Sequence, residues 1–357
     1  MYHRLVIALV CITFANAIAH AQTGNSAMQP SQAELNTETT DSRTLTAFTN
    51  RKQHTEDWTT IYLAKSNLPL NATGGLVLSK VELQPGCTRE LVRLQWRAND
   101  PIELYVIRPN REEKLPVVMF LYNYNYDIDV FREERWCERA VQNGFAVAGF
   151  GSALSWQRIH TPRPLKEWFV SELQEALATS THDVQMILNY LETRGDLDLH
   201  SVGIFGQGSG GAIAILAAAA DSRISTLDLM DPWGAWPDWL QGSKQIPEEE
   251  RSGYLKPEFL QQVSNLDPIT YLPQLKGKSL RIQQVLADTV TPNPAKNKIM
   301  SAAPSTAEVT RYSDISEEAK TLGSNGIVGW FGEQLRPKNH LPEVSRNPNG
   351  SGANSAR

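Results

Sequence analysis

The chain has 357 residues, of which 41% are hydrophobic and 20% are charged, and its formal net charge is −5. It is long enough for one large domain with a sizeable core. The acidic balance argues against a nucleic-acid partner and against an anionic membrane surface. A small molecule, such as a carbohydrate or an ester, is the partner that we expect.

The first 21 residues predict a secretory signal peptide. Arg4 supplies the positive start, residues 5–18 form an apolar run too short for a good membrane span, and residues 19–21 form an A-x-A cleavage site. An N-terminal anchor helix is the alternative. We expect a secreted or periplasmic protein without membrane contact after cleavage, because no later stretch reaches about 18 consecutive apolar residues.

Two polar segments flank the expected domain. Residues 22–56 are rich in Thr, Ser, Asn and Gln and predict a flexible linker, and residues 337–357 predict a disordered tail. Residues 57–336 are expected to form one α/β domain. Within it, residues 232–276 have many Pro and Trp residues and little periodicity, which predicts a cap insertion.

The order of elements predicts the fold class. Two segments that alternate between apolar and polar residues, 91–96 and 102–107, favour an antiparallel N-terminal hairpin. The elements that follow alternate between strands and helices, which predicts a mostly parallel, doubly wound sheet with right-handed crossovers. The further expected strands are 116–122, 144–150, 202–206, 224–230, 279–287 and 307–312, and the expected helices are 130–142, 172–193, one opening at 212, and 327–335.

Residues 202–211 (VGIFGQGSGG) have the pattern of a nucleophile elbow, in which an apolar strand, a tight Gly-rich turn and a helix follow one another. In serine hydrolases of this type the turn reads Gly-x-Ser-x-Gly. A strand end at Gly206 and the glycine pair 210–211 both place Gly208 at the nucleophile position. Glycine relieves the strain of a positive φ there, but it has no oxygen that could attack.

Ser209 is the alternative nucleophile. This assignment moves the strand end by one residue and turns the side chain to the wrong side. The backbone amide of Ser209 is also a candidate donor to a bound carbonyl oxygen.

From Leu91 to Leu335 the chain resembles the α/β-hydrolase superfamily, and in detail secreted esterase, acetyl-xylan-esterase and prolyl-oligopeptidase-type domains. The resemblance is carried by residues 206–211, by the strand that ends at Asp288 with the turn 289–292, and by the segment 267–275. It implies an α/β-hydrolase fold and an acid position at Asp288, here vestigial. An ordinary capping or turn aspartate is the alternative at Asp288.

The histidine base that the resemblance implies is missing. The family's histidine follows the last strand, but residues 312–326 contain none, and His340 lies in the predicted tail. Glu317 or Glu318 could replace it, although exposed carboxylates at the start of a helix are the alternative interpretation.

Loops after the strands are expected to meet beyond the carboxyl ends of the strands, where open α/β sheets bind ligands. Tyrosine and asparagine offer stacking faces and hydrogen-bond donors, and arginine and histidine suit an anion or hydroxyl groups. An aspartate at a strand end is another place for the acid. The candidate pocket residues are Tyr122, Asn123, Tyr124, Arg158, His160, Asp231 and Trp233.

Each of these residues also has a structural interpretation. Tyr122 to Tyr124 fit ordinary loop polarity, and His160 fits a hydrogen bond to the backbone. Trp233, Trp236 and Trp239 lie within seven residues and predict either a stacking platform for a carbohydrate or core packing.

The elbow glycines allow a second motif. Gly206, Gly208 and Gly211 fit the dinucleotide fingerprint G-x-G-x-x-G, and Asp228 follows Gly206 by 22 residues. However, the motif comes after several strands, whereas such fingerprints open their domain. Export would also separate the protein from cellular nicotinamide pools. We therefore expect no cofactor.

The cysteines leave two possibilities open. Cys11 lies in the predicted signal peptide, so Cys87 and Cys137 remain. In an exported chain they can form one disulfide, or they can stay as two buried thiols. Two cysteines without clustered histidines do not make a metal site.

These features predict an exported, catalytically degenerate hydrolase-fold protein with a ligand-binding or structural role. The alternative is an active serine-type esterase or peptidase-like hydrolase with a rearranged site. A dinucleotide-binding module is the third possibility.

Overall fold

The computed structural model describes residues 56–70, 74–98, 100–124, 128–154, 158, 170 and 172–336. The predicted signal peptide, the predicted linker up to residue 55, the predicted tail and His160 lie outside the described residues. Among the helices of the described part, none is both long enough and apolar enough to cross a membrane.

The described residues form a mostly parallel sheet of nine strands in the order β1-β2-β3-β5-β4-β6-β7-β8-β9. The strands β1 to β3 and the pair β3–β5 are antiparallel, and every pair from β5–β4 onward is parallel. The predicted fold class is therefore confirmed. The bounds are β1 Leu76–Leu83, β2 Cys87–Arg97, β3 Asp100–Pro109, β4 Leu115–Leu121, β5 Ala146–Phe150, β6 Leu197–Gln207, β7 Ile224–Met230, β8 Ser279–Val285 and β9 Glu308–Tyr312.

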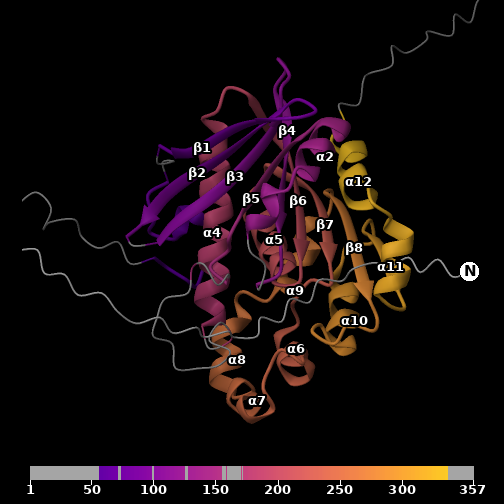
Figure 1. Cartoon of the computed structure of the whole chain (residues 1–357). Helices are drawn as coiled ribbons and strands as arrows, with labels where there is room; N and C mark the ends of the chain where they lie inside the picture. The colour runs from indigo at the N-terminus through magenta and orange to yellow at the C-terminus, as the bar shows by residue number, and fades with distance from the viewer. Residues whose placement is uncertain are drawn as a thin grey trace, which may run out of the picture. The chain divides into compact units, whose positions relative to one another are not determined.

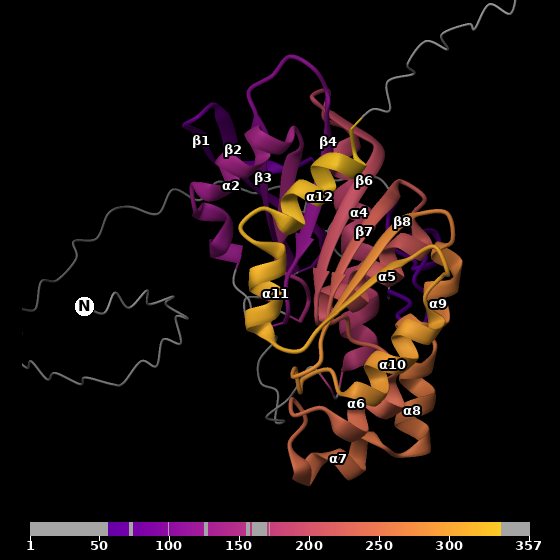
Figure 2. The same ribbon diagram turned by 90° about the vertical axis from the view of Figure 1, so that its right-hand side faces the viewer.

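Helices cover both faces of the sheet. The helices α4 (Leu173–Glu192) and α5 (Ser209–Ala220) lie on one face, and α2 (Arg135–Asn143) and α12 (Gly326–Gln334) lie on the other, as Figures 1 and 2 show. Successive residues of a strand point to opposite faces. Met119 of β4 accordingly packs in the core cluster under α4 and α5, whereas Phe120 packs in the cluster under α2 and α12.

The predicted cap corresponds to a run of short helices between β7 and β8. It comprises α6 (Trp236–Gly242), α7 (Glu248–Tyr254), α8 (Pro257–Ser264), α9 (Pro268–Tyr271) and a 3-10 turn, η4 (Leu272–Leu275). Figure 1 shows α6, α7 and α8 beyond the carboxyl ends of the parallel strands. The remaining elements are α10 (Asn293–Ala302), α11 (Ile315–Leu322), η1 (Leu63–Lys65) and η2 (Ile128–Arg132).

Cys87 and Cys137 form a disulfide that joins the start of β2 to α2. Their Cα atoms are 5.8 Å apart, and both side chains are fully buried. Of the two possibilities that the sequence leaves open, the structure shows the disulfide.

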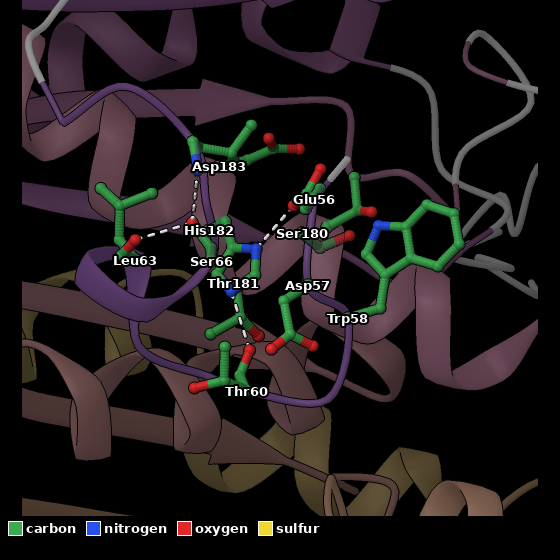
Figure 3. Close-up of polar contacts among 12 residues, drawn as sticks. Glu56, Asp57, Trp58, Thr60, Leu63, Ser66, Ser180, Thr181, His182 and Asp183 are labelled. Carbon is green, nitrogen blue, oxygen red and sulfur yellow. Dashed lines mark hydrogen bonds and ion pairs between the residues drawn. The ribbon is translucent and has the colours of Figure 1, made fainter. Parts of the chain in front are cut away.

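The first described residues are anchored on the long helix α4, as Figure 3 shows. His182 Nδ1 lies 2.6 Å from Glu56 Oε1, and its Nε2 lies 2.8 Å from the carbonyl oxygen of Thr60. Arg97 forms ion pairs with Glu56 and Asp183. Burial alone would raise the pKa of Glu56, but hydrogen bonds from Arg97 and His182 outweigh it and lower the pKa to about 2. The segment before β1 is therefore held by a buried ionic cluster.

Candidate functional site

Gly208 lies at the turn between β6 and α5. Its backbone angles are φ +55° and ψ −115°, a region that L side chains rarely adopt. Its N–H donates to the carbonyl oxygen of Met230 at 2.9 Å, and its own carbonyl oxygen accepts from Trp233 N at 3.0 Å. The strand-to-helix turn therefore has the strained backbone of a nucleophile elbow, and glycine is the residue that adopts it with the least strain.

The strand and the helix also approach each other closely at this turn. A Cβ atom at Gly206 would lie 2.6 Å from the carbonyl oxygen of Gly210 and 2.7 Å from the Cα of Gly211. Real Cβ atoms do not come this close to backbone. The glycines around Gly208 therefore let α5 start directly on the end of β6.

The space that a nucleophile would occupy is already filled. A Cβ atom at Gly208 would lie 2.7 Å from Asn123 Oδ1, 2.9 Å from Asn123 Cγ and 3.2 Å from Trp233 Nε1. Trp233 is itself buried, and its ring packs 4.5 Å from that of Trp239. The elbow thus faces two side chains of the protein instead of an open cleft.

Asn123 follows β4 and places its amide oxygen against three donors. The oxygen accepts from Tyr124 N at 3.0 Å, from Ser209 N at 3.3 Å and from Ser209 Oγ at 3.1 Å. In serine hydrolases with this elbow, the oxyanion hole consists of the N–H after the nucleophile and an N–H from the loop after a neighbouring strand. Ser209 N and Tyr124 N are the corresponding donors here. The amide oxygen of Asn123 therefore accepts from the two N–H groups that correspond by position to the donors of an oxyanion hole, and we call this arrangement the Asn123 plug.

Ser209, the alternative nucleophile, is completely buried, and its hydroxyl donates to Asn123. Among the described residues, the histidines are His182 and His200. His182 contacts Glu56 and Thr60 inside the anchor of the N-terminal segment, and the exposed His200 pairs with Asp198. His160 and His340 lie outside the described residues. Within the described part, no histidine contacts Ser209.

The two candidate acids, Asp231 and Asp288, flank a buried lysine from α10. Lys296 Nζ lies 3.9 Å from Asp231 Oδ1 and 3.7 Å from Asp288 Oδ2, and its side chain is 1% exposed. The Asp288 carboxylate accepts from Val290 N at 3.1 Å and from Thr291 N at 2.9 Å. These contacts are those of a turn-capping aspartate, so the geometry favours the structural alternative for Asp288.

Asp231 is the more perturbed of the two acids. Burial, and then the charge of Asp288, raise the pKa of Asp231 to about 7, although Lys296 acts in the opposite direction. Its Oδ1 accepts from Val285 N at 2.9 Å, and its backbone has a φ of +42°. No sequence pattern pointed to Lys296, because its partners come from two other strand ends.

Of the other candidate pocket residues, Tyr124 and Trp233 pack together with ring centroids 6.0 Å apart, whereas Arg158 belongs to a buried ionic cluster. Arg158 is buried, with its Nε donating to Asp100 Oδ1 at 3.0 Å and its Nη1 donating to Asp183 Oδ2 at 2.6 Å. These two carboxylates satisfy its charge, so an anion-binding role for Arg158 stays a prediction without support from its contacts. The hydroxyl of Tyr124 accepts from Gln245 of the cap at 2.6 Å.

The three tryptophans 233, 236 and 239 are all at most 1% exposed. They pack against one another, with ring centroids 4.5 Å and 5.7 Å apart for the two pairs that involve Trp239. A stacking platform needs an exposed ring face. These rings therefore act as core packing of the cap.

The acidic residue of the dinucleotide motif, Asp228, already forms an ion pair inside the sheet. Asp228 lies inside β7, is fully buried, and pairs with Arg281 at 2.6 Å. It also accepts from Gln283 Nε2 at 2.8 Å. A ribose ligand could not reach this carboxylate, so the geometry does not support nucleotide binding.

No protein-family model matches the chain, and no curated protein matches it. Solved structures, however, do match the chain. The chain superposes on acetyl xylan esterase 1 from Thermoanaerobacterium sp. JW/SL YS485 with a TM-score of 0.52 and 14% identity, covering 68% of this chain and 82% of that one. This protein has the α/β-hydrolase fold.

Two further structures with this fold are similar. The S-formylglutathione hydrolase from Agrobacterium tumefaciens has a TM-score of 0.53 and 14% identity, covering 72% of this chain and 96% of that one. The acylaminoacyl peptidase from Pyrococcus horikoshii has a TM-score of 0.53 and 14% identity, covering 70% of this chain and 42% of that one. At this identity the likeness concerns the fold alone, so activity has to be argued from the elbow.

Proposed function

We propose that this protein is a hydrolase-fold protein that no longer hydrolyses esters or peptides at its elbow and that binds a small ligand. The observation that carries the proposal is the Asn123 plug. The amide oxygen of Asn123 accepts from Ser209 N and Tyr124 N, where a reacting carbonyl oxygen would have to bind.

The chemistry of the elbow supports the loss of hydrolysis. Gly208 has no side-chain oxygen, so an acyl-enzyme cannot form there. Losing the serine of such a triad typically lowers kcat by about 10⁶, and part of the residual rate comes from the oxyanion hole. In this protein the hole is filled as well, which removes that residual source.

Ser209 offers little support for the active alternative. Its hydroxyl is buried against Asn123, and within the described residues no histidine lies at hydrogen-bond distance to accept its proton. The structurally similar esterases and peptidase are named for hydrolytic activities. For this chain to have such an activity, Asn123 would have to move away from Ser209, and a residue outside the described part would have to act as the base.

The disulfide supports export. Disulfides persist in oxidising compartments and are rare in the cytosol. The Cys87–Cys137 disulfide therefore agrees with the predicted signal peptide and with a secreted or periplasmic location.

The test is labelling with a fluorophosphonate probe together with the hydrolysis of short-chain nitrophenyl esters, measured on the wild-type protein and on Ser209→Ala. An active serine esterase run beside them confirms the reagents. We expect no labelling and no turnover above the buffer rate. Labelling that disappears in Ser209→Ala would show that Ser209 is a nucleophile, and labelling that persists would show an unrecognised one. Either result overturns the proposal.

A further inference from the structure

A cavity of about 260 Å³ lies between the sheet and the helices α2, α11 and α12. It is lined by the ends of β4, β6 and β7, and its wall includes Tyr122 and Gln207, the residue directly before Gly208. Figure 2 shows α11 and α12 on the face of the sheet that also carries α2. None of Asn123, Ser209 and Tyr124 lines it. The cavity is therefore next to the elbow but separate from the Asn123 plug.

Aromatic rings form one part of the wall. The rings of Tyr122 and Phe205 have centroids 6.0 Å apart in an edge-to-face arrangement, and those of Phe120 and Trp136 are 4.7 Å apart. All four residues line the cavity. Phe120, Trp136 and Phe205 are buried and support the wall from behind, and the half-buried Tyr122 is the ring that a planar, apolar ligand group can contact.

Arg139 brings a positive charge to the same cavity without a carboxylate partner. Its guanidinium lies 5.4 Å from the ring centroid of Trp136, and its Nη2 donates to the carbonyl oxygen of Ser324 at 3.5 Å. Within the described residues it forms no ion pair. Burial, and then the charge of Arg135, lower the pKa of Arg139. The charges of Glu133 and Glu138 act in the opposite direction. A ligand anion that paired with the guanidinium would offset the penalty that burial places on its charge.

Glu318 of α11 brings a negative charge to the cavity and also lacks a partner. It is half-buried, and its carboxylate makes no hydrogen bond or ion pair within the described part of the chain. Burial raises the pKa of Glu318. Arg139 and Glu318 do not pair with each other, so the cavity contains one charged group of each sign that forms no ion pair within the described residues.

We propose that this cavity binds a small aromatic zwitterion, an aromatic amino acid or a close analogue. The ring lies against Tyr122, the carboxylate pairs with Arg139, and the ammonium group pairs with Glu318. A volume of about 260 Å³ falls just below the range of about 300–1,000 Å³ found for drug-sized ligands, which suits a single ring with a short charged end. The inference gives a ligand class to the binding role proposed above and does not depend on the loss of hydrolysis.

The test is calorimetric titration and thermal shift of the full mature chain with four compounds. L-Tyrosine and L-phenylalanine carry both charges, tyramine carries only the amine, and 3-(4-hydroxyphenyl)propionate carries only the acid. We expect both amino acids to bind and each single-charge analogue to bind at least about tenfold more weakly, because a charge-assisted hydrogen bond is lost.

Two variants assign the charges. In Arg139→Gln, tyrosine should lose its advantage over tyramine, and in Glu318→Gln it should lose its advantage over the propionate. The matched controls are Arg135→Gln, on the same helix but exposed, and Glu333→Gln, an exposed carboxylate on α12; both should bind like the wild type. Circular dichroism checks that every variant is folded.

Three results would overturn the inference: no binding of any of the four compounds at millimolar concentration, equal binding of tyrosine and tyramine, or unchanged selectivity in both variants. These outcomes are independent of the probe experiment. A protein that resists the fluorophosphonate but ignores tyrosine keeps the proposed loss of hydrolysis and loses the ligand class. A protein that is labelled by the fluorophosphonate but selects tyrosine keeps the ligand class and contradicts the proposed loss of hydrolysis.

Discussion

Restoring the missing serine with Gly208→Ser tests the account of the elbow most directly. The new Cβ would lie 2.7 Å from Asn123 Oδ1 and 2.9 Å from Asn123 Cγ, so one of the two residues must move. Asn123 cannot move freely, because its amide oxygen accepts from Tyr124 N, Ser209 N and Ser209 Oγ. The substitution should therefore destabilise the protein rather than repair it.

The expected cost has two parts. A residue other than glycine in a sparsely populated φ/ψ region costs about 1–3 kcal/mol. Overpacking a filled site costs a further ~1–3 kcal/mol. Gly208→Ser should thus lower the free energy of unfolding by about 2–6 kcal/mol. Asn123→Ala removes the two closest atoms, so in that background Gly208→Ser should cost the backbone part and only the small shift that Trp233 Nε1, 3.2 Å away, must make.

The assay is denaturant unfolding of four proteins: the wild type, Gly208→Ser, Asn123→Ala and the double variant. The cycle should give a coupling of about 1–3 kcal/mol between the two positions. Effects that add to within about 0.5 kcal/mol would refute the steric account, as would a Gly208→Ser protein as stable as the wild type. We also expect Gly208→Ser to show no fast ester turnover, and a large gain would show that a histidine such as His160 reaches the elbow.

Three further outcomes follow from charges and from the disulfide. The pKa of Asp231 is about 7 in the folded state against an ordinary value of 3.8. Between pH 3.8 and pH 7 the Asp231 carboxyl therefore keeps its proton in the folded state and loses it in the unfolded state. The free energy of unfolding should then fall by up to about 4 kcal/mol as the pH rises from 4 to 7, and Asp231→Asn should flatten this slope in unfolding curves measured across that range. For Glu56, lowered from 4.5 to about 2, stabilisation is present above pH 4.5 and is lost as the pH falls towards 2. Glu56→Gln should cost about 3 kcal/mol at pH 7, and an acid titration as steep as that of the wild type would contradict this assignment. Replacing Cys87 and Cys137 by alanine opens a loop with a sequence separation of 50, which should lower the free energy of unfolding by about 4 kcal/mol without changing ligand selectivity.

Much of the fold could be predicted from local patterns. The apolar runs 116–122 and 144–150 became β4 and β5, and the expected helix 172–193 became α4, Leu173–Glu192. Each is long, strongly patterned and buried by its neighbours. The strand β1, Leu76–Leu83, was not predicted, because it lies at the sheet edge with both faces largely exposed and so has no one-sided apolar pattern.

The site was less accessible to sequence reasoning. The position of Gly208 in the turn followed from the strand end and the glycine pair, which are local features. The Asn123 plug joins residues 86 positions apart, and its partner Ser209 gave no sign of that contact. Likewise, Arg158 was predicted near a pocket because it follows a strand, whereas Asp100 and Asp183 pair with it from distant segments. Ion pairs of this kind depend on tertiary placement, which a motif does not contain.

The Asn123 plug also changes how this protein would respond to inhibitors. Reagents that bind in an oxyanion hole, such as a boronate, a trifluoromethyl ketone or an ester, reach it by diffusion. Their occupancy therefore depends on the concentration at which they are supplied. Here such a reagent competes with an amide that is covalently attached and already aligned with Ser209 N and Tyr124 N. Even a flexibly tethered group has an effective concentration of about millimolar, and a group held in place exceeds that. Screens that sort hydrolase-fold proteins by such reagents would therefore pass over this one, although its backbone donors are intact.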